Sequence, residues 1–254
     1  MNGENELISI IMPAHNAEKT LPLAVNSVLA QTYQNYELII INDCSHDRTL
    51  ALAEQYANTD SRIRVLSNEE NIGVSLTRHK GIESARGEWL AFLDSDDAWT
   101  SDKLEKQMIL QRQKNAKFIF TGSAFMDDQD APINWIMHVP KKIGYRRLLK
   151  QNLVSNSSVL IQKSCYLEHE FIGNGLHEDF VCWLRLLRSG EAAYGIDEPL
   201  LIYRLSSSSK SGNKLKAAKM NWNAYRAAGL NVLEASYYMV WYVVNGLRKY
   251  RNLR

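Results

Sequence analysis

The chain has 254 residues, enough for one large α/β domain with a substantial buried core, and its 45% of hydrophobic residues is ordinary for a soluble protein. Its three cysteines are odd in number and show no metal-ligand spacing, which argues against a secreted disulfide scaffold and fits a reducing cytosol. Residues 1–6 are polar and acidic, so we expect no secretory signal peptide, which needs a basic region and an apolar core.

The net charge of +2 is unevenly distributed along the chain. Residues 204–254 contain ten Lys or Arg residues and a single acid, Glu234, so this segment carries +9 and residues 1–203 carry −7. A basic tail on an acidic body predicts an anionic partner for the tail. Phosphate groups, an anionic membrane surface and nucleic acid all satisfy that description.

In chain order, the first half repeats strand and helix. Apolar runs predict strands at residues 7–12, 38–41, 63–66 and 90–93, and amphipathic segments between them predict helices that begin near Thr20, run through residues 50–53 and open at residues 71–73. Strand and helix in alternation with short links predict a mostly parallel, Rossmann-like sheet with helices on both faces. The polar turns after each strand then meet at one edge of that sheet.

The stretch LAFLDSDDAW at residues 90–99 organises the rest of the chain. Its apolar run predicts a strand buried on both faces, and the run ends in Asp94, Asp96 and Asp97, at the end where open α/β sheets bind their ligands. Carboxylates this close repel one another unless a cation or hydrogen bonds offset the charge, and Mg²⁺ or Mn²⁺ prefers such oxygens. The alternative is a solvated acidic turn that caps a helix at Thr100 or Ser101, and spacing alone does not decide between them.

Two other turns carry residues suited to a nucleotide. Asp43 offers an acceptor for the imide N–H of uracil, and Arg78 offers a cation to a diphosphate. Taken singly, Asp43 is more typical of a helix cap, Asn71 of a turn and Arg78 of a solvated helix surface. Their expected position at the same sheet edge favours a common site.

Four separated motifs in the first half carry a family resemblance: SIIMPAHN at 9–16, NDCSHD at 42–47, NIG at 71–73 with Arg78 after it, and GEWLAFLDSDD at 87–97. In this order they resemble the nucleotide-sugar half of the family 2 inverting glycosyltransferases, and the resemblance spans roughly residues 7–204. It implies a glycosyltransferase-A fold. Three positions depart from the usual pattern, where the family has an aromatic ring at His15, a second Asp at Asn42 and Gly at Cys44.

The resemblance also implies roles for the residues of these motifs. The Asp94-Ser95-Asp96 triplet would bind the ribose and, through Asp96 and Asp94, the Mn²⁺ or Mg²⁺ ion that carries the diphosphate. The remaining residues assigned to the nucleotide sugar are Pro13, Ala14, His15 and Asp43 around the nucleoside, Asn71 beside them, and Arg78 at the phosphates.

The second half predicts a helix at 102–114 and strands at 118–120 and 157–161, the latter bringing Asn156 and Ser157 toward the cleft. Residues 126–144 show no clear pattern, and Trp135 and His138 within them are more typical of core or cleft lining than of catalysts.

Glu178 and Asp179 precede a strongly apolar helix at 180–187. Acids are common at helix starts because the helix dipole favours them. The resemblance instead implies that Asp179 is the general base and that Glu178 supports it or binds the acceptor, with Trp183 and Arg185 completing the motif. The chemistry needs such a group, because the acceptor hydroxyl loses its proton as it attacks.

A strand at 199–203 leads into a polar, basic loop at 204–214. A serine run is usually a flexible linker. We prefer a lid that orders on the diphosphate through Arg204, Ser209 and Lys210, because closure would exclude water from the transfer.

Two helices are expected at the end of the chain, at 214–228 and 233–250. The second has an aromatic and apolar run too short to span a bilayer, followed by Arg248, Lys249, Arg251 and Arg254. This order predicts a helix that lies on an anionic membrane. Packing on the body of the protein or in an oligomer interface is the alternative.

The sequence therefore predicts a catalytic domain at residues 1–212, with a nucleotide-sugar half at 1–99 and an acceptor half at 100–212, and a helical extension at 213–254. The function predicted is hexose transfer from a nucleotide sugar, UDP-linked in our interpretation, to a glycan held on a polyprenyl diphosphate, as in bacterial O-antigen, capsule or exopolysaccharide synthesis. We expect an enzyme in the cytoplasm, peripheral on the inner face of the membrane, without a nucleic-acid partner.

Two alternatives remain. Phosphatases of the haloacid dehalogenase class also pair aspartates after a strand, but after the first strand and with a following Thr. A catalytically silent membrane scaffold would not need an intact set of acids, so the presence of Asp43, Asp94, Asp96 and Asp179 together argues against it.

Overall fold

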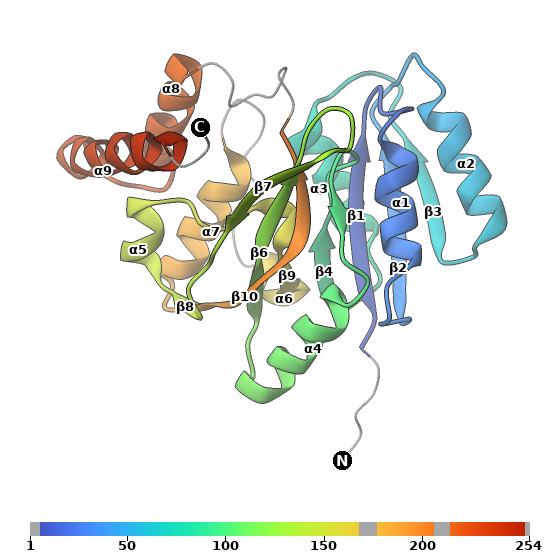
Figure 1. Ribbon diagram of the computed structural model, residues 1–254, viewed down its shortest axis with the longest axis horizontal. Helices are drawn as coiled ribbons and strands as arrows, with labels where there is room; N and C mark the ends of the chain where they lie inside the picture. The colour runs from blue at the N-terminus through green and yellow to red at the C-terminus, as the bar shows by residue number, and fades with distance from the viewer. Residues whose placement is uncertain (1–5, 168–176, 206–213, 252–254) are drawn as a thin grey trace.

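The computed structural model describes residues 6–167, 177–205 and 214–251 (Figure 1). Its strands are β1 (Ile8–Ala14), β2 (Tyr36–Asn42), β3 (Ile63–Ser67), β4 (Trp89–Phe92), β5 (Ala98–Trp99), β6 (Phe118–Met126), β7 (Pro132–Met137), β8 (Lys142–Ile143), β9 (Leu160–Gln162) and β10 (Ala193–Arg204). Its helices are α1 (Leu21–Leu29), α2 (Thr49–Thr59), α3 (Val74–Ser84), α4 (Lys103–Lys114), α5 (Tyr145–Lys150), the 3₁₀ turn η1 (Asn156–Ser158), α6 (Lys163–Leu167), α7 (Glu178–Arg188), α8 (Lys214–Ala227) and α9 (Val232–Arg251).

One mixed sheet runs through the molecule in the order β3-β2-β1-β4-β9-β6-β10-β5, with β7 paired to β6 and β8 to β10. In its first half β3, β2, β1 and β4 are all parallel, as the sequence predicts, and Ile10 of β1 lies opposite Leu38 on one side and Ala91 on the other. Every residue of β1, β2 and β4 is buried, because helices cover both faces of these strands.

The two faces form two separate cores. One face packs Ile11, Ile39 and Phe92 against α3 and α7, and the other packs Ile10, Met12 and Leu38 against α1 and α2. Gly81 of α3 lets that helix approach the sheet closely, since a Cβ there would lie 2.7 Å from side-chain atoms of both Ile11 and Ile41. The expected fold class, a mostly parallel sheet between layers of helices, is confirmed.

The second half of the sheet is mixed. β9 runs antiparallel to both β4 and β6, β10 runs parallel to β6, and β5 pairs antiparallel with β10. The region 126–144 forms β7 and β8, which the sequence left unassigned. The expected strand at 157–161 is shorter, because Ser157 and Ser158 belong to η1, where the Ser158 hydroxyl donates to Ser155 O at 2.7 Å.

The last two helices pack on α5 and α7 at one end of the molecule (Figure 1). Tyr225 of α8 is buried, and its hydroxyl donates to Leu149 O at 2.7 Å. Arg185 and Arg188 of α7 donate to the carbonyl oxygens of Ala227 and Ala228 at 3.1 Å each. Among the described residues, the helices include none whose length and hydrophobicity suit a membrane crossing.

Candidate active site

The polar turns of the first half meet at the carboxyl edge of the sheet. Asp43 N donates to Ala14 O at 2.8 Å, which ties the turn after β2 to the end of β1. His15 Nδ1 donates to Asp43 O at 2.7 Å, and Asn71 Nδ2 lies 3.1 Å from His15 Nε2. Pro13 and Ala14 are buried at the end of β1, while the His15 ring is exposed. The structure therefore brings together the residues predicted to surround the nucleoside.

Asp43 is buried and holds the loop at 71–73. Its oxygens accept hydrogen bonds from Asn68 Nδ2 (2.9 Å), Ile72 N (3.0 Å) and Gly73 N (2.9 Å). Burial alone would raise the pKa of Asp43, but these hydrogen bonds outweigh it and lower the pKa. Because a carboxylate has about four acceptor positions, Asp43 has little capacity left for a nucleobase.

The acidic turn follows β4 and Leu93. Asp97 N donates to Asp94 O at 3.0 Å, and Asp94 N donates to the Ser157 hydroxyl at 3.2 Å. Burial and the charge on Asp94 raise the pKa of Asp96 to about 6. Asp97 is almost fully buried; its Oδ1 accepts from Arg204 N at 3.0 Å, and its Oδ2 has no hydrogen-bond partner among the described residues. The turn therefore concentrates three carboxylates, and burial together with the neighbouring acids raises the pKa of Asp96 and of Asp97.

That excess of carboxylate oxygen fits a hard divalent cation. Asp94 and Asp96 are partly exposed and are the side chains of this turn available to such an ion. Among the described residues, no three His, Cys, Asp or Glu side chains converge as a metal cage. A cation at Asp94 and Asp96 would therefore take its other ligands from water or from a bound phosphate, as Mg²⁺ sites commonly do.

Arg78 of α3 connects this turn to α7. Its guanidinium is buried and donates to Asp94 Oδ1 at 2.8 Å and to Glu178 Oε1 at 2.6 Å. Burial would lower the pKa of Arg78, but the charges on Asp94, Glu178 and Asp179 outweigh it and raise the pKa. A direct bond from Arg78 to a diphosphate, as the sequence predicts, would require it to release one of these carboxylates.

Glu178 and Asp179 form the first turn of α7. Trp183 of the same helix is fully buried against Phe92 and Phe118, with ring centroids 6.2 and 4.8 Å away, so the helix start is fixed relative to β4. Burial and the charge on Glu178 raise the pKa of Asp179 to about 7, against the opposing effect of Arg78. A carboxylate that titrates near neutral pH is suited to general base catalysis.

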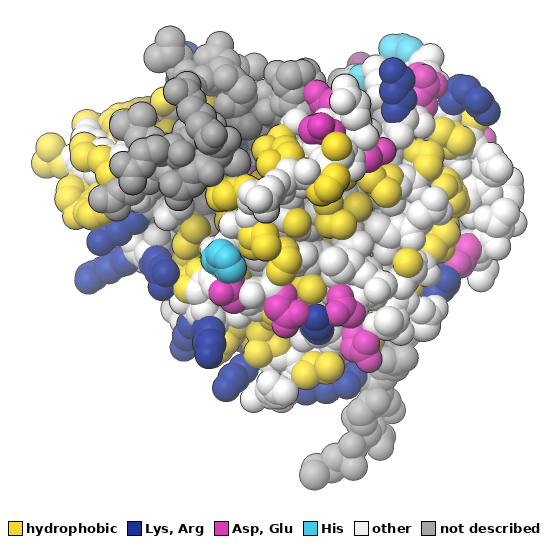
Figure 2. All heavy atoms as spheres, in the orientation of Figure 1, with side chains coloured by type: hydrophobic (Ala, Val, Ile, Leu, Met, Phe, Trp, Pro, Cys, Tyr) yellow, Lys and Arg dark blue, Asp and Glu magenta, His cyan; other side chains and the backbone are white. Residues whose placement is uncertain are grey.

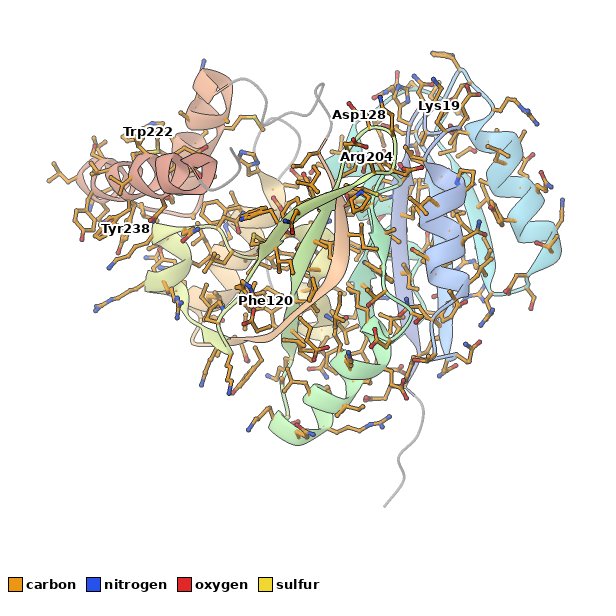
Figure 3. All side chains as sticks on the ribbon, in the orientation of Figure 1. Lys19, Phe120, Asp128, Arg204, Trp222 and Tyr238 are labelled. Carbon is orange, nitrogen blue, oxygen red and sulfur yellow. The ribbon has the colours of Figure 1, made fainter. Side chains whose placement is uncertain are left out.

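Arg204 is not the free lid residue that the sequence predicts. Its side chain is buried at the end of β10 and donates to Asp96 O (2.9 Å), Asp127 O (2.8 Å) and Asp130 Oδ1 (2.5 Å), beside the turn that carries Asp128 (Figure 3). These contacts use the guanidinium to hold the backbone of the acidic turn at Asp96 and the turn at residues 127–130. Ser209 and Lys210, the other predicted lid residues, lie outside the described residues.

Lys103 and Gln107 are buried polar residues that the sequence interpretation missed. Lys103 Nζ lies 3.9 Å from the centre of the Trp99 ring and donates to Gln107 Oε1 at 2.9 Å, and Gln107 donates to Ser158 O at 3.0 Å. Trp99 Nε1 donates to Ser157 O at 2.7 Å. This network holds η1, and with it the Ser157 hydroxyl, against the acidic turn. The signal was a polar pair four residues apart on the face of α4 that also carries the core residues Leu104 and Met108.

Trp135 lies in β7, and His138 follows the end of that strand. The Trp135 ring packs on Phe125 with centroids 4.4 Å apart, and the exposed His138 pairs with Asp197 Oδ1 at 3.1 Å.

The family model for Glycosyl transferase family 2 matches residues 9–173. The chain belongs to glycosyl transferase family 2. It is 37% identical over 250 residues to TuaG of Bacillus subtilis, whose name assigns it to teichuronic acid biosynthesis, covering 98% of this chain and 99% of TuaG. It is 34% identical over 249 residues to the Escherichia coli UDP-Glc:alpha-D-GlcNAc-diphosphoundecaprenol beta-1,3-glucosyltransferase WfgD, covering 97% and 96% of the two chains.

Among solved structures, the Pyrobaculum calidifontis mannosyltransferase PcManGT in complex with GDP-Man and Mn²⁺ is similar with a TM-score of 0.69 at 12% identity, covering 92% of this chain and 68% of that one. This likeness shows the glycosyltransferase-A fold. The family model and the two bacterial relatives show that the chain is a glycosyltransferase of the kind found in bacterial polysaccharide synthesis, and the phosphatase and scaffold alternatives are not supported. The acids also follow the fourth strand, β4, and not the first as in those phosphatases.

Proposed function

We propose that this family 2 enzyme transfers a hexose from a UDP-sugar to a glycan held on a polyprenyl diphosphate, in the synthesis of a bacterial surface polysaccharide. The observation that carries this proposal is the Arg78 bridge, which joins the acidic turn at Asp94 to the acidic pair on α7. This bridge supports a single site in which the groups proposed to bind the donor lie close to the proposed proton acceptor. The relative WfgD supports the substrate classes, since its name gives UDP-Glc and a diphosphoundecaprenol-linked GlcNAc.

The donor would bind along the edge of the first half. The nucleoside lies among Pro13, Ala14, His15 and Asn71, with Asp43 shaping the loop, and Ser95 lies in the acidic turn between Asp94 and Asp96. Mn²⁺ or Mg²⁺ at Asp96 and Asp94 would offset the charge of the departing diphosphate. PcManGT in complex with GDP-Man and Mn²⁺ supports this use of a metal.

Asp179 would act as the general base. It accepts the proton of the acceptor hydroxyl while that oxygen bonds to the anomeric carbon, and the bond from this carbon to the diphosphate oxygen breaks with UDP as the leaving group. One displacement with one base inverts the anomeric configuration. Glu178 keeps Arg78 in place, which holds Asp94 and α7 in register, and it borders the acceptor.

The domain boundary, location and lid are part of the same proposal. Residues 1–212 form the catalytic domain and residues 213–254 a helical extension that contacts an anionic membrane from the cytoplasmic side. Ser209 and Lys210 would cover the diphosphate, with Arg204 as the fixed anchor of that segment.

The test is a transfer assay with several UDP-sugars, a GlcNAc-diphosphate lipid as acceptor, and either Mn²⁺ or EDTA. We expect a glycoside product of inverted configuration by NMR, UDP released in equal amount, and no turnover with EDTA. A product that keeps the donor configuration contradicts the single displacement. Free phosphate in place of UDP contradicts transferase chemistry.

A further inference from the structure

Helix α9 exposes an apolar stripe to solvent. Leu233, Tyr237, Val240 and Val243 are 83%, 55%, 62% and 50% exposed. Their spacing of three or four residues places them on one face of the helix, opposite the fully buried Ala235 that faces the core. Large apolar side chains gathered on one exposed face indicate an interaction surface.

A basic segment lies beside this helix. Five of the ten residues from 141 to 150 are Lys or Arg, and no acid occurs between residues 131 and 167. Lys141, Lys142, Arg146 and Arg147 are exposed, and Lys150 is half-buried. Among the described residues, none of the five forms a salt bridge. The segment therefore presents uncompensated positive charge.

The stripe and the basic segment adjoin. Lys150 Nζ lies 4.8 Å from the centre of the Trp241 ring, and Asn245 Nδ2 donates to Lys150 O at 2.9 Å, so α5 borders α9 along the side next to Tyr237. Figure 2 shows dark blue Lys and Arg side chains over α5 and β8, directly below the yellow side chains of α9. Apolar and cationic groups thus form one continuous face.

We propose that residues 141–150 and the exposed face of α9 together dock on an anionic phospholipid bilayer. The stripe would enter the headgroup layer while the cations bind lipid phosphates. This rests on the proposed function, in which the acceptor is held in the same membrane. It differs from the sequence prediction because the attracting charge belongs to the catalytic domain, at residues 141–150, in addition to the tail.

Charge complementarity favours a membrane over a second copy of the chain. A symmetric dimer places the same patch on both sides of its contact, so two basic segments would face each other across a shared apolar stripe. Like charges so arranged oppose association, whereas an anionic lipid surface attracts each of the five cations.

The test measures sedimentation of the full chain with vesicles of phosphatidylglycerol and phosphatidylcholine, and with phosphatidylcholine alone. The variant R146E/R147E should weaken binding to the anionic vesicles by at least about tenfold, since each basic residue near such a surface contributes to attraction. Its matched control is R112E/K114E on α4, which makes the same charge change at exposed positions of another helix and should alter binding less than about twofold. V240N should weaken binding and leave its salt dependence unchanged.

Three outcomes would contradict the docking proposal. An equal loss of vesicle binding in R146E/R147E and R112E/K114E would show that only the net charge of the protein matters. Unchanged vesicle binding in R146E/R147E would show that residues 141–150 do not contact the membrane. A concentration-dependent dimer in sedimentation velocity that V240N abolishes would make the stripe a self-contact. UDP affinity and transfer to a water-soluble acceptor serve as folding controls and should stay unchanged. If the unmodified protein binds vesicles but transfers sugar to none of the acceptors, that result would contradict the proposed function and leave the docking proposal standing.

Discussion

The two halves of the sheet handle burial in different ways. In the first half β1 and β2 are buried along their whole length and all neighbouring strands are parallel. In the second half β7 alternates exposed and half-buried residues, and β10 is interrupted by irregular pairing around Pro199. In the first half, helices cover both faces of the sheet, and the polar turns that follow its strands meet at one edge. The second half has more exposed strands, and its helix α7 brings Glu178 and Asp179 to that edge.

This difference assigns separate tasks to the halves. The groups proposed to bind the donor lie on turns fixed by a double-sided core, whereas the proposed base lies on α7, a helix that reaches the site through the packing of Trp183 on Phe92 and Phe118. Arg78 joins the two sets of groups through its ion pairs with Asp94 and Glu178. If this division holds, damage on one side should change donor affinity and damage on the other should change turnover.

The largest effect is expected at Asp179. Asp179→Asn should lower kcat by about 10²-fold or more, the scale for loss of a positioned base, while UDP-sugar affinity changes less than about twofold. Steady-state kinetics and calorimetric titration measure the two quantities. Asp197→Asn, an exposed acid on β10, is the control and should leave both unchanged. If Asp179→Asn also weakened donor binding, donor binding and proton acceptance would not be assigned to separate halves.

The next effect is expected at Asp96. Asp96→Ala should weaken Mn²⁺-dependent UDP binding by about 10–100-fold, because the remaining carboxylates cannot hold the ion in register with the phosphates. Calorimetric titrations with UDP in the presence of Mn²⁺ and in the presence of EDTA measure how much of the UDP affinity depends on the metal. Unchanged affinity and unchanged metal dependence would place the cation elsewhere.

Sequence patterns predicted the first half well because its information is local. A continuous apolar run specifies a strand buried on both faces, and the turn after it follows directly in the chain, so Asp43 and Asp94 could be assigned to one edge. The second half depends on contacts between distant residues. The burial of Arg204 results from Asp96, Asp127 and Asp130, and a Ser-rich context next to an Arg gave no sign of them. Likewise, η1 is held by hydrogen bonds from Trp99 to Ser157 O and from Gln107 to Ser158 O, across 58 and 51 residues of chain.

The pH dependence of turnover provides a third test. Burial and Glu178 raise the pKa of Asp179 to about 7, and a base acts only when ionised. With saturating donor and metal, kcat should therefore fall about tenfold per pH unit below this value and level off above it. The Asp179→Asn variant should show no such inflection. A wild-type profile that is flat down to about pH 5 would remove Asp179 from the role of base.

The smallest effect is expected at Lys103, where α4 joins the halves. Burial lowers the pKa of Lys103 in the folded protein well below its usual range, whereas a Lys in the unfolded chain titrates near pH 10.4. Because the unfolded state then binds more protons, the free energy of unfolding should rise with pH between these two pKa values. The contribution is at most about 1.4 kcal/mol per pH unit.

Lys103→Met isolates this contribution, since Met fills a similar volume without a titrating group, and Lys114→Met on the exposed end of α4 is the matched control. Urea unfolding at pH 7 and pH 9 should show the free energy of unfolding of wild type and of Lys114→Met rising relative to that of Lys103→Met at the higher pH. Equal pH dependence in all three proteins would mean that Lys103 stays protonated in the fold. The Trp99 ring at 3.9 Å would then stabilise a buried cation strongly enough to offset its desolvation, and the network behind Ser157 would be ionic.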